Sequence, residues 1–234
     1  MTMTKPPTAH PYDDTDVIDA RAPRFNQAVV GIVGVIALLT GWWWLFALLA
    51  LQLTLGLTLG RRWCLPCVFY FEVVQPRLGE GRVEDARPPR FANLVGATLL
   101  WATVAADAVG ASLVGMILGA LVAVLALLAA TTGLCVGCQL YRLLARVRRI
   151  RAGAVGAVDL AELGAQAGDV AIVQFTHPLC SDCRALEQRL AGGERPVVTV
   201  DVSKRPDLAH RYHIAVVPTA FAVAGDGSVV ERLA

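Results

Sequence analysis

The chain has 234 residues, of which 56% are hydrophobic and only 17% are charged, and its net charge is +2. This balance excludes an ordinary soluble domain, in which about 25% of residues are charged, and predicts a membrane domain. Nothing in the sequence indicates binding of nucleotides, phosphate or nucleic acid.

The first 24 residues are polar and acidic and contain several prolines. A cleavable signal peptide would instead have a basic start followed by an apolar core, so none is predicted here. We expect residues 1–24 to form a disordered cytoplasmic tail.

Two long stretches carry the membrane signal. Residues 25–60 contain no charged side chain, and residues 91–141 contain only Asp107. One helix over the first stretch would be ~52 Å long, too long for a hydrocarbon core of about 30 Å. Each stretch therefore predicts two spans, separated at Thr40-Gly41 and after Asp107. The predicted spans lie near residues 26–41, 43–60, 91–107 and 112–134.

The arginines and lysines predict the orientation of these spans. Basic residues precede the first span, fill the loop between the second and third, and follow the fourth, whereas the two short turns on the other side contain none. By the positive-inside rule, both termini and the middle loop are expected on the cytoplasmic side. Residues 25–151 thus form a predicted membrane domain whose first partner is the lipid bilayer.

An internal repeat organises this domain. Arg21-Ala22-Pro23-Arg24-Phe25 recurs as Arg87-Pro88-Pro89-Arg90-Phe91, and a C-x-x-C-x-x-Y motif ends each copy, at residues 64–70 and 135–141. Because each copy holds two spans, the copies share one orientation and predict a pseudo-twofold axis along the membrane normal. The two tandem hairpin repeats cover residues 21–70 and 87–141.

Pairs of glycines four residues apart occur in the second and fourth spans, at Gly56/Gly60 and Gly115/Gly119. Such pairs allow helices to approach closely. They are compatible with packing inside the bundle and also with a homodimer.

All six cysteines belong to C-x-x-C pairs. With no cysteine left over, this pattern favours redox or metal chemistry over a structural disulfide framework. The pairs are Cys64/Cys67, Cys135/Cys138 and Cys180/Cys183.

After a linker of small residues at 152–157, the pattern changes to alternating helices and strands. The third cysteine pair falls where a buried strand meets a helix, which is the setting of a redox motif. Helices are expected at residues 158–166, 181–190 and 205–212, and strands at 170–176, 197–202, 219–224 and 228–232.

A thiolate attacks a disulfide, so the attacking cysteine needs a lowered pKa. The start of a helix provides this for Cys180, and Cys183 can then resolve the mixed disulfide. Asp182 should oppose the thiolate by charge repulsion. We interpret His177 as a surface residue of the loop; the alternative is that its protonated ring favours the thiolate.

Residues 152–234 form the predicted second domain, and within it residues 158–234 resemble a thioredoxin domain. The resemblance is carried by Ala171-Ile172-Val173-Gln174-Phe175 as central strand, Cys180-Ser181-Asp182-Cys183 at the helix start and Val217-Pro218-Thr219. The resemblance implies a nucleophile at Cys180, a resolving thiol at Cys183 and a cis-proline at Pro218, beside which the backbone is free to pair with an extended substrate. The chain departs from the family at three places. Thioredoxins have Gly-Pro between the cysteines, where this chain has Ser181-Asp182. They have an aromatic residue before the first cysteine and a buried acid on the central strand, where this chain has Leu179 and Gln174. The final thioredoxin helix is also expected to be missing.

Residues 19–141 resemble a bacterial membrane family of unknown function, through the Asp-Ala-Arg motifs that start at Asp19 and Asp85 and through Cys135-Val136-Gly137-Cys138. This resemblance implies an integral protein of the bacterial cell membrane. It implies an architecture but no activity.

Two interpretations of the membrane-domain cysteines stay open. In the first, they form a redox relay that exchanges electrons with Cys180/Cys183, and no cofactor is needed. In the second, all four converge on a tetrahedral metal site, most simply for zinc. The four cysteines are Cys64, Cys67, Cys135 and Cys138.

We therefore expect an α-helical membrane domain with four transmembrane helices, followed by an α/β thioredoxin-like domain. The expected function is thiol-disulfide exchange at the cytoplasmic face, with a thiol or disulfide protein or a small sulfur compound as partner. The alternative is a membrane protein with a four-cysteine zinc site and a thioredoxin-like interaction module.

Overall fold

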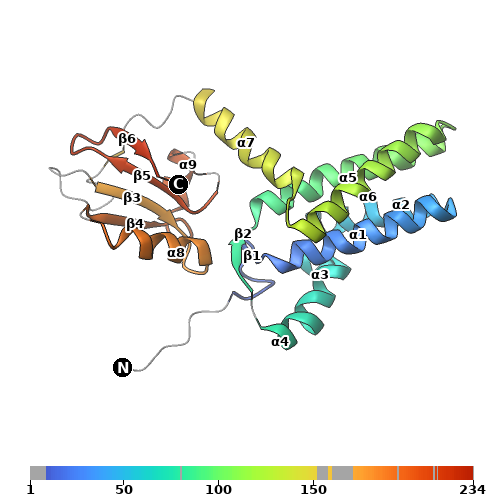
Figure 1. The fold of residues 1–234 in the computed structure, drawn as a ribbon, viewed down its shortest axis with the longest axis horizontal. Helices are drawn as coiled ribbons and strands as arrows, with labels where there is room; N and C mark the ends of the chain where they lie inside the picture. The colour runs from blue at the N-terminus through green and yellow to red at the C-terminus, as the bar shows by residue number, and fades with distance from the viewer. Residues whose placement is uncertain are drawn as a thin grey trace. The chain divides into compact units, whose positions relative to one another are not determined.

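The computed structural model describes residues 9–79, 81–151, 158–159, 171–193, 195–212, 214 and 216–233 (Figure 1). The chain forms two compact units. The helical unit comprises residues 10–81 and 86–141, and the C-terminal unit comprises residues 82–85 and 142–234. The predicted linker at 152–157 and nearly all of the predicted helix at 158–166 lie outside the described residues.

Four long helices build the helical unit. Helix α1 packs against α6, α2 packs against α5, and α5 packs against α6, so the helices lie side by side (Figure 1). The chain turns between them at Gly41 and Gly110, whose φ angles of 71° and 80° suit glycine. The long helices are α1 (Arg21–Thr40), α2 (Trp44–Thr58), α5 (Arg87–Ala108) and α6 (Ser112–Thr132).

Three of these helices, α1, α5 and α6, are long and apolar enough to cross a membrane. Helix α2 is equally apolar, but its 15 residues make it about 22 Å long, shorter than a hydrocarbon core of about 30 Å. Large apolar side chains point outward from the bundle, among them Leu39, Leu48, Ile117 and Val124. Such an outer surface suits lipid and supports membrane association.

Small residues form the inner face of α6. Its buried positions are glycines and alanines together with one valine. An ideal Cβ built on Gly119 would lie 2.6 Å from Cζ of the buried Phe46, and one built on Gly34 of α1 would lie 3.0 Å from the Cβ of Ala123. The helices therefore approach closely where a side chain is missing, which is the usual basis of helix packing in membranes.

Short elements follow α2 and precede α1. The first cysteine pair lies between a 3₁₀ turn and a short helix, and a π-helical turn and a last helical turn follow. The elements are β1 (Val17–Asp19), η1 (Arg61–Trp63), α3 (Leu65–Phe69), η2 (Tyr70–Val74) and α4 (Gln75–Leu78).

Residues 9–20 are ordered, although a disordered tail was expected over residues 1–24; residues 1–8 lie outside the described part. The guanidinium group of Arg61 holds this segment by donating hydrogen bonds of 2.6–3.1 Å to four backbone carbonyls. Burial and the nearby Arg90 lower the pKa of Arg61 to about 10, so it keeps its charge at neutral pH. The four carbonyls belong to Pro11, Asp14, Thr15 and Val17.

The C-terminal unit contains a four-stranded sheet in the order β4-β3-β5-β6. Strand β3 pairs parallel with β4 and antiparallel with β5, and β5 pairs antiparallel with β6. These elements confirm the predicted ones within one residue at each end. They are β3 (Ala171–Thr176), α8 (Ser181–Leu190), β4 (Val197–Asp201), α9 (Pro206–Arg211), β5 (Thr219–Val223) and β6 (Val229–Arg232).

The two faces of the sheet contact different helices. Ile172 packs with Leu186 of α8, whereas Val173 and Phe175 pack with Leu208 of α9. Alternation along β3 produces this division, because successive side chains of a strand point to opposite faces. Two more elements complete the described structure: α7 (Val136–Arg151), which crosses the boundary between the units, and the short strand β2 (Val83–Asp85), which belongs to the C-terminal unit.

The contact between α6 and Phe46 gives a direct test of the helix packing. Replacing Gly119→Ala should destabilise the bundle by about 1–3 kcal/mol, because the added methyl group meets a buried ring. Gly96→Ala on α5 is the matched control, since its Cβ would lie 3.6 Å from Leu53, an ordinary contact distance. Denaturant unfolding of the detergent-solubilised protein measures the difference; equal stability of the two variants would contradict the packing.

Candidate functional site

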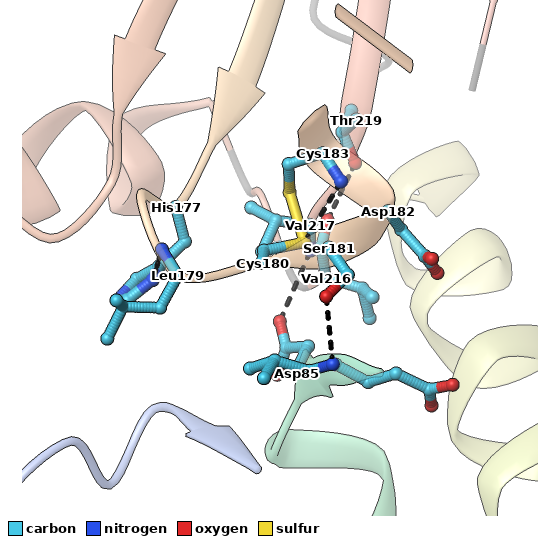
Figure 2. The surroundings of a disulfide bond; sticks show 12 residues. Asp85, His177, Leu179, Cys180, Ser181, Asp182, Cys183, Val216, Val217 and Thr219 are labelled. Carbon is cyan, nitrogen blue, oxygen red and sulfur yellow. Dashed lines mark hydrogen bonds between the residues drawn. A yellow bond between two sulfur atoms is a disulfide. The ribbon is translucent and has the colours of Figure 1, made fainter. Parts of the chain in front are cut away.

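The pair Cys180/Cys183 lies where the central strand β3 leads into α8. Cys180 is the N-cap residue of α8, and its sulfur accepts a hydrogen bond of 3.2 Å from the backbone N–H of Cys183. The two cysteines form a disulfide, with their Cα atoms 5.3 Å apart (Figure 2). A sulfur in this position faces the positive end of the helix dipole, which stabilises a thiolate once the disulfide is reduced.

Side chains beneath the pair are buried and hydrogen-bonded. Gln174, on the central strand, donates a hydrogen bond of 2.9 Å to the carbonyl oxygen of Cys183. His177 is only 7% exposed, so its interpretation as a surface residue was wrong. Its Nδ1 accepts a hydrogen bond from the backbone N–H of Leu179, which fixes the loop before the first cysteine (Figure 2).

Pro218 follows a cis peptide bond from Val217, as the sequence resemblance implied. Val217 lies close to the disulfide in Figure 2, and its backbone N–H points to the carboxylate of Asp85 at 3.2 Å. Neither Asp85 nor its neighbours were predicted to belong to this site. No local pattern could have placed them there, because 132 residues separate Asp85 from Val217.

The pair Cys64/Cys67 lies in the helical unit, at the start of α3. These cysteines form a disulfide and are almost fully buried. The side-chain amide of Gln52 donates to Oδ1 of Asn26 and lies 3.3 Å from the sulfur of Cys64. The amide side chains of Asn26 on α1 and Gln52 on α2 thus lie beside the Cys64–Cys67 disulfide at the end of the bundle.

A cavity of about 210 Å³ opens beside this disulfide. Its walls are largely apolar, but the amides of Asn26, Gln52 and Asn93 and the guanidinium group of Arg90 also line it. A second cavity of about 100 Å³ is lined by Cys135 and shares Asn26 and Asn93 with the first. Cavities of the helical unit therefore adjoin the Cys64/Cys67 disulfide and the sulfur-bearing residue Cys135.

Cys135 and Cys138, at the start of α7, are not joined by a disulfide. The sulfur of Cys135 accepts hydrogen bonds from the backbone N–H of Cys138 and from the amide of Gln27. Hydrogen bonding by Cys138, together with Gln27, lowers the pKa of Cys135 to about 6 against the opposing effect of burial. With this pKa, Cys135 is largely a thiolate at neutral pH, the form that attacks disulfides.

The glycine between these two cysteines has a packing role. An ideal Cβ on Gly137 would lie 2.7 Å from the Cβ of Ala92 in α5. The absence of a side chain lets the start of α7, and with it the sulfur of Cys135, lie directly against the bundle. The first repeat has Pro66 at this position, which is compatible with the first turn of α3.

The structure brings the members of each pair together. Within the described residues, no group of three or more His, Cys, Asp or Glu side chains is arranged to hold a metal ion. The four-cysteine zinc site thus stays a prediction, without a preformed ligand cluster to support it. Adjacent residues on α1, Asn26 and Gln27, nevertheless connect the two membrane-domain pairs through the amide contacts described above.

The lowered pKa of Cys135 predicts how fast it reacts at each pH. Because the thiolate is the reactive form, alkylation of Cys135 should accelerate as the pH rises through about 6 and level off above neutrality. In Gln27→Leu the midpoint should rise by about one unit, the effect of losing one hydrogen bond to a charged group. Gln52→Leu, which removes the amide beside the other pair, is the control and should leave this midpoint unchanged. Peptide mass mapping of the alkylated chain provides the rates, and a midpoint near 8.5 in the wild type would contradict the assignment.

Comparison with known proteins identifies the family of the helical part of the chain. A family model described as a domain of unknown function, DUF4395, matches residues 18–146 and so covers more than half of the chain. The match includes both cysteine pairs of the helical unit and ends before Cys180. No curated protein and no solved structure matches the chain.

Proposed function

Since the chain belongs to the DUF4395 family, whose function is unknown, we propose from its cysteine chemistry that it is a membrane-anchored thiol-disulfide oxidoreductase. In this proposal Cys180 is the nucleophile, Cys183 is the resolving thiol and Pro218 borders the substrate. The observation that carries the proposal is the N-cap position of Cys180, with its sulfur hydrogen-bonded to the backbone N–H of Cys183.

The strand order supports a thioredoxin fold for the C-terminal unit. A parallel pair, β3 and β4, and an antiparallel pair, β5 and β6, lie in one sheet with a C-x-x-C pair at the end of the central strand. Pro218 immediately precedes β5, the neighbour of that strand. The same edge of the sheet therefore carries both the disulfide and the loop that would hold a substrate.

The reaction transfers two electrons to a substrate disulfide. The Cys180 thiolate attacks one substrate sulfur, forms a mixed disulfide and releases the other substrate sulfur as a thiolate. The Cys183 thiolate then attacks the sulfur of Cys180, forming the Cys180–Cys183 disulfide and releasing the second substrate thiolate. The substrate thiolates take up protons according to their pKa values, and the reverse sequence would oxidise a dithiol.

We further propose that α1, α2, α5 and α6 all span the bilayer, with both termini cytoplasmic. The apolar outer surface of the helices supports insertion, and α2 can span if its ends are extended by the tryptophans before it and by local thinning of the bilayer. The absence of Lys and Arg from the two short turns supports this orientation. The substrate is then a cytoplasmic protein disulfide or a small sulfur compound.

The membrane-domain pairs are proposed partners of this exchange. Cys135, with its lowered pKa, is suited to attack the Cys180–Cys183 disulfide, and Cys138 could complete the transfer by forming a disulfide with Cys135. Two electrons would pass to Cys180/Cys183 in this step. Tethering in one chain favours the reaction, because it raises the effective concentration of the partners to about the millimolar range.

The reduction of insulin by dithiothreitol, followed by turbidity, tests the oxidoreductase. Cys180→Ser should abolish the catalysed rate, whereas Cys183→Ser, reduced, freed of dithiothreitol and then mixed with insulin, should accumulate a mixed disulfide visible on a non-reducing gel. Cys138→Ser is the matched control, because dithiothreitol supplies the electrons directly and the catalysed rate should persist. Full activity in Cys180→Ser would disprove the assigned nucleophile.

A further inference from the structure

The short segment Arg82-Val83-Glu84-Asp85 lies on the disulfide face of the C-terminal unit, and we call it the 82–85 segment. The backbone N–H of Val83 donates a hydrogen bond of 3.0 Å to the hydroxyl of Ser181. The guanidinium group of Arg82 lies 2.5 Å from the carboxylate of Asp182. With the contact between Asp85 and Val217, the segment touches both the C-x-x-C turn and the loop before Pro218 (Figure 2).

These contacts use the two residues that distinguish this C-x-x-C from the thioredoxin sequence. A Gly-Pro pair between the cysteines would offer no hydroxyl to accept a hydrogen bond from the Val83 N–H and no carboxylate to form an ion pair with Arg82. Ser181 and Asp182 provide both. The ion pair with Arg82 also compensates the negative charge that Asp182 would otherwise place beside the sulfur of Cys180.

The disulfide is closed to solvent in the structure, and the 82–85 segment lies against it. Cys180 and Cys183 are both 0% exposed, and Val83 and Asp85 are themselves buried to 3% and 7%. The sulfur of Cys180 must approach a substrate disulfide along the S–S axis of the substrate, which requires open space beside Cys180. In addition, the backbone N–H of Val217 already donates to the carboxylate of Asp85 and is not available to a substrate. A protein substrate and the 82–85 segment therefore compete for the same surface.

The segment belongs to one copy of the internal repeat. The sequence Val17-Ile18-Asp19-Ala20-Arg21 recurs as Val83-Glu84-Asp85-Ala86-Arg87, and in both copies the valine and the aspartate are buried in a short strand. Asp19 accepts hydrogen bonds from the hydroxyl of Tyr70 and from the backbone N–H of Gly81 in the helical unit. Asp85 accepts one from Val217 in the C-terminal unit, so the second copy of the motif serves the redox site.

We propose that the 82–85 segment is a built-in occupant of the substrate-binding face, which caps the Cys180–Cys183 site until a substrate displaces it. This inference rests on the proposed function, because it assigns a regulation to the same site. Displacement exposes Cys180 and frees the Val217 N–H for the backbone of an extended substrate. Release of Arg82 also leaves Asp182 without its cation.

The rate of Cys180 alkylation by iodoacetamide in the reduced, full-length protein tests the cap. Arg82→Ala removes the ion pair and Val83→Pro removes the N–H that Ser181 accepts, so each should react roughly tenfold faster than the wild type, the factor that corresponds to about 1.4 kcal/mol. Ser181→Ala, which removes the same hydrogen bond from the other side, should match Val83→Pro. Arg77→Ala on α4 removes an arginine outside the segment and should react at the wild-type rate.

Insulin reduction by the same variants separates the cap from the proposed function. Faster alkylation together with faster insulin reduction in Arg82→Ala and Val83→Pro would establish the cap on an active enzyme. Wild-type alkylation rates in both variants, with insulin reduction intact, would overturn the cap and leave the oxidoreductase standing. Faster alkylation in variants that, like the wild type, reduce no insulin would overturn the oxidoreductase, while the segment would still be shown to cover Cys180.

Discussion

The hydrogen bond from a backbone N–H to a cysteine sulfur, at the first turn of a helix, is the interaction on which the chemistry of this chain depends. It occurs twice, from Cys183 to Cys180 and from Cys138 to Cys135. In both cases the C-x-x-C spacing places the second cysteine in the first turn of the helix, where its backbone N–H can donate to the sulfur of the first cysteine. At Cys135, hydrogen bonding by the side chain and backbone of Cys138, with a further contribution from the amide of Gln27, lowers the pKa even though the sulfur is partly buried.

The helical unit supplies the setting for two of the three pairs. Glycines and alanines let α1 and α6 approach closely, and amide side chains rather than charges reach the sulfurs from the bundle. Amides are suited to this position, because they donate hydrogen bonds to sulfur without the cost of burying an ion. Asn26 and Gln27 are consecutive in α1, and their side chains reach toward Cys64 and Cys135, respectively. One turn of α1 is therefore linked to the cysteine pair that ends each copy of the repeat.

Local patterns predicted much of this arrangement, whereas contacts between distant segments could not be predicted. The helix break at Gly41 and the position of Cys180 between strand and helix follow from short-range spacing, and both agree with the structure. The order of residues 9–20 depends on Arg61, about fifty residues away in the chain, and no neighbouring residue reveals it. The docking of Asp85 beside Val217 likewise arises only from the tertiary structure, which a single sequence does not specify.

The central claim is that Cys180 and Cys183 are a working dithiol–disulfide couple. Equilibrating the detergent-purified chain in glutathione buffers of graded potential, then counting oxidised pairs by differential alkylation and measuring bound zinc, tests it most directly. We expect Cys180/Cys183 to interconvert as one two-electron couple within the range of the buffers, in zinc-free protein. About one zinc per chain, lost on changing Cys64 or Cys135, would establish a metal site in the helical unit and rule out the relay, whereas a Cys180/Cys183 pair that stays in one state at every potential would contradict the couple itself.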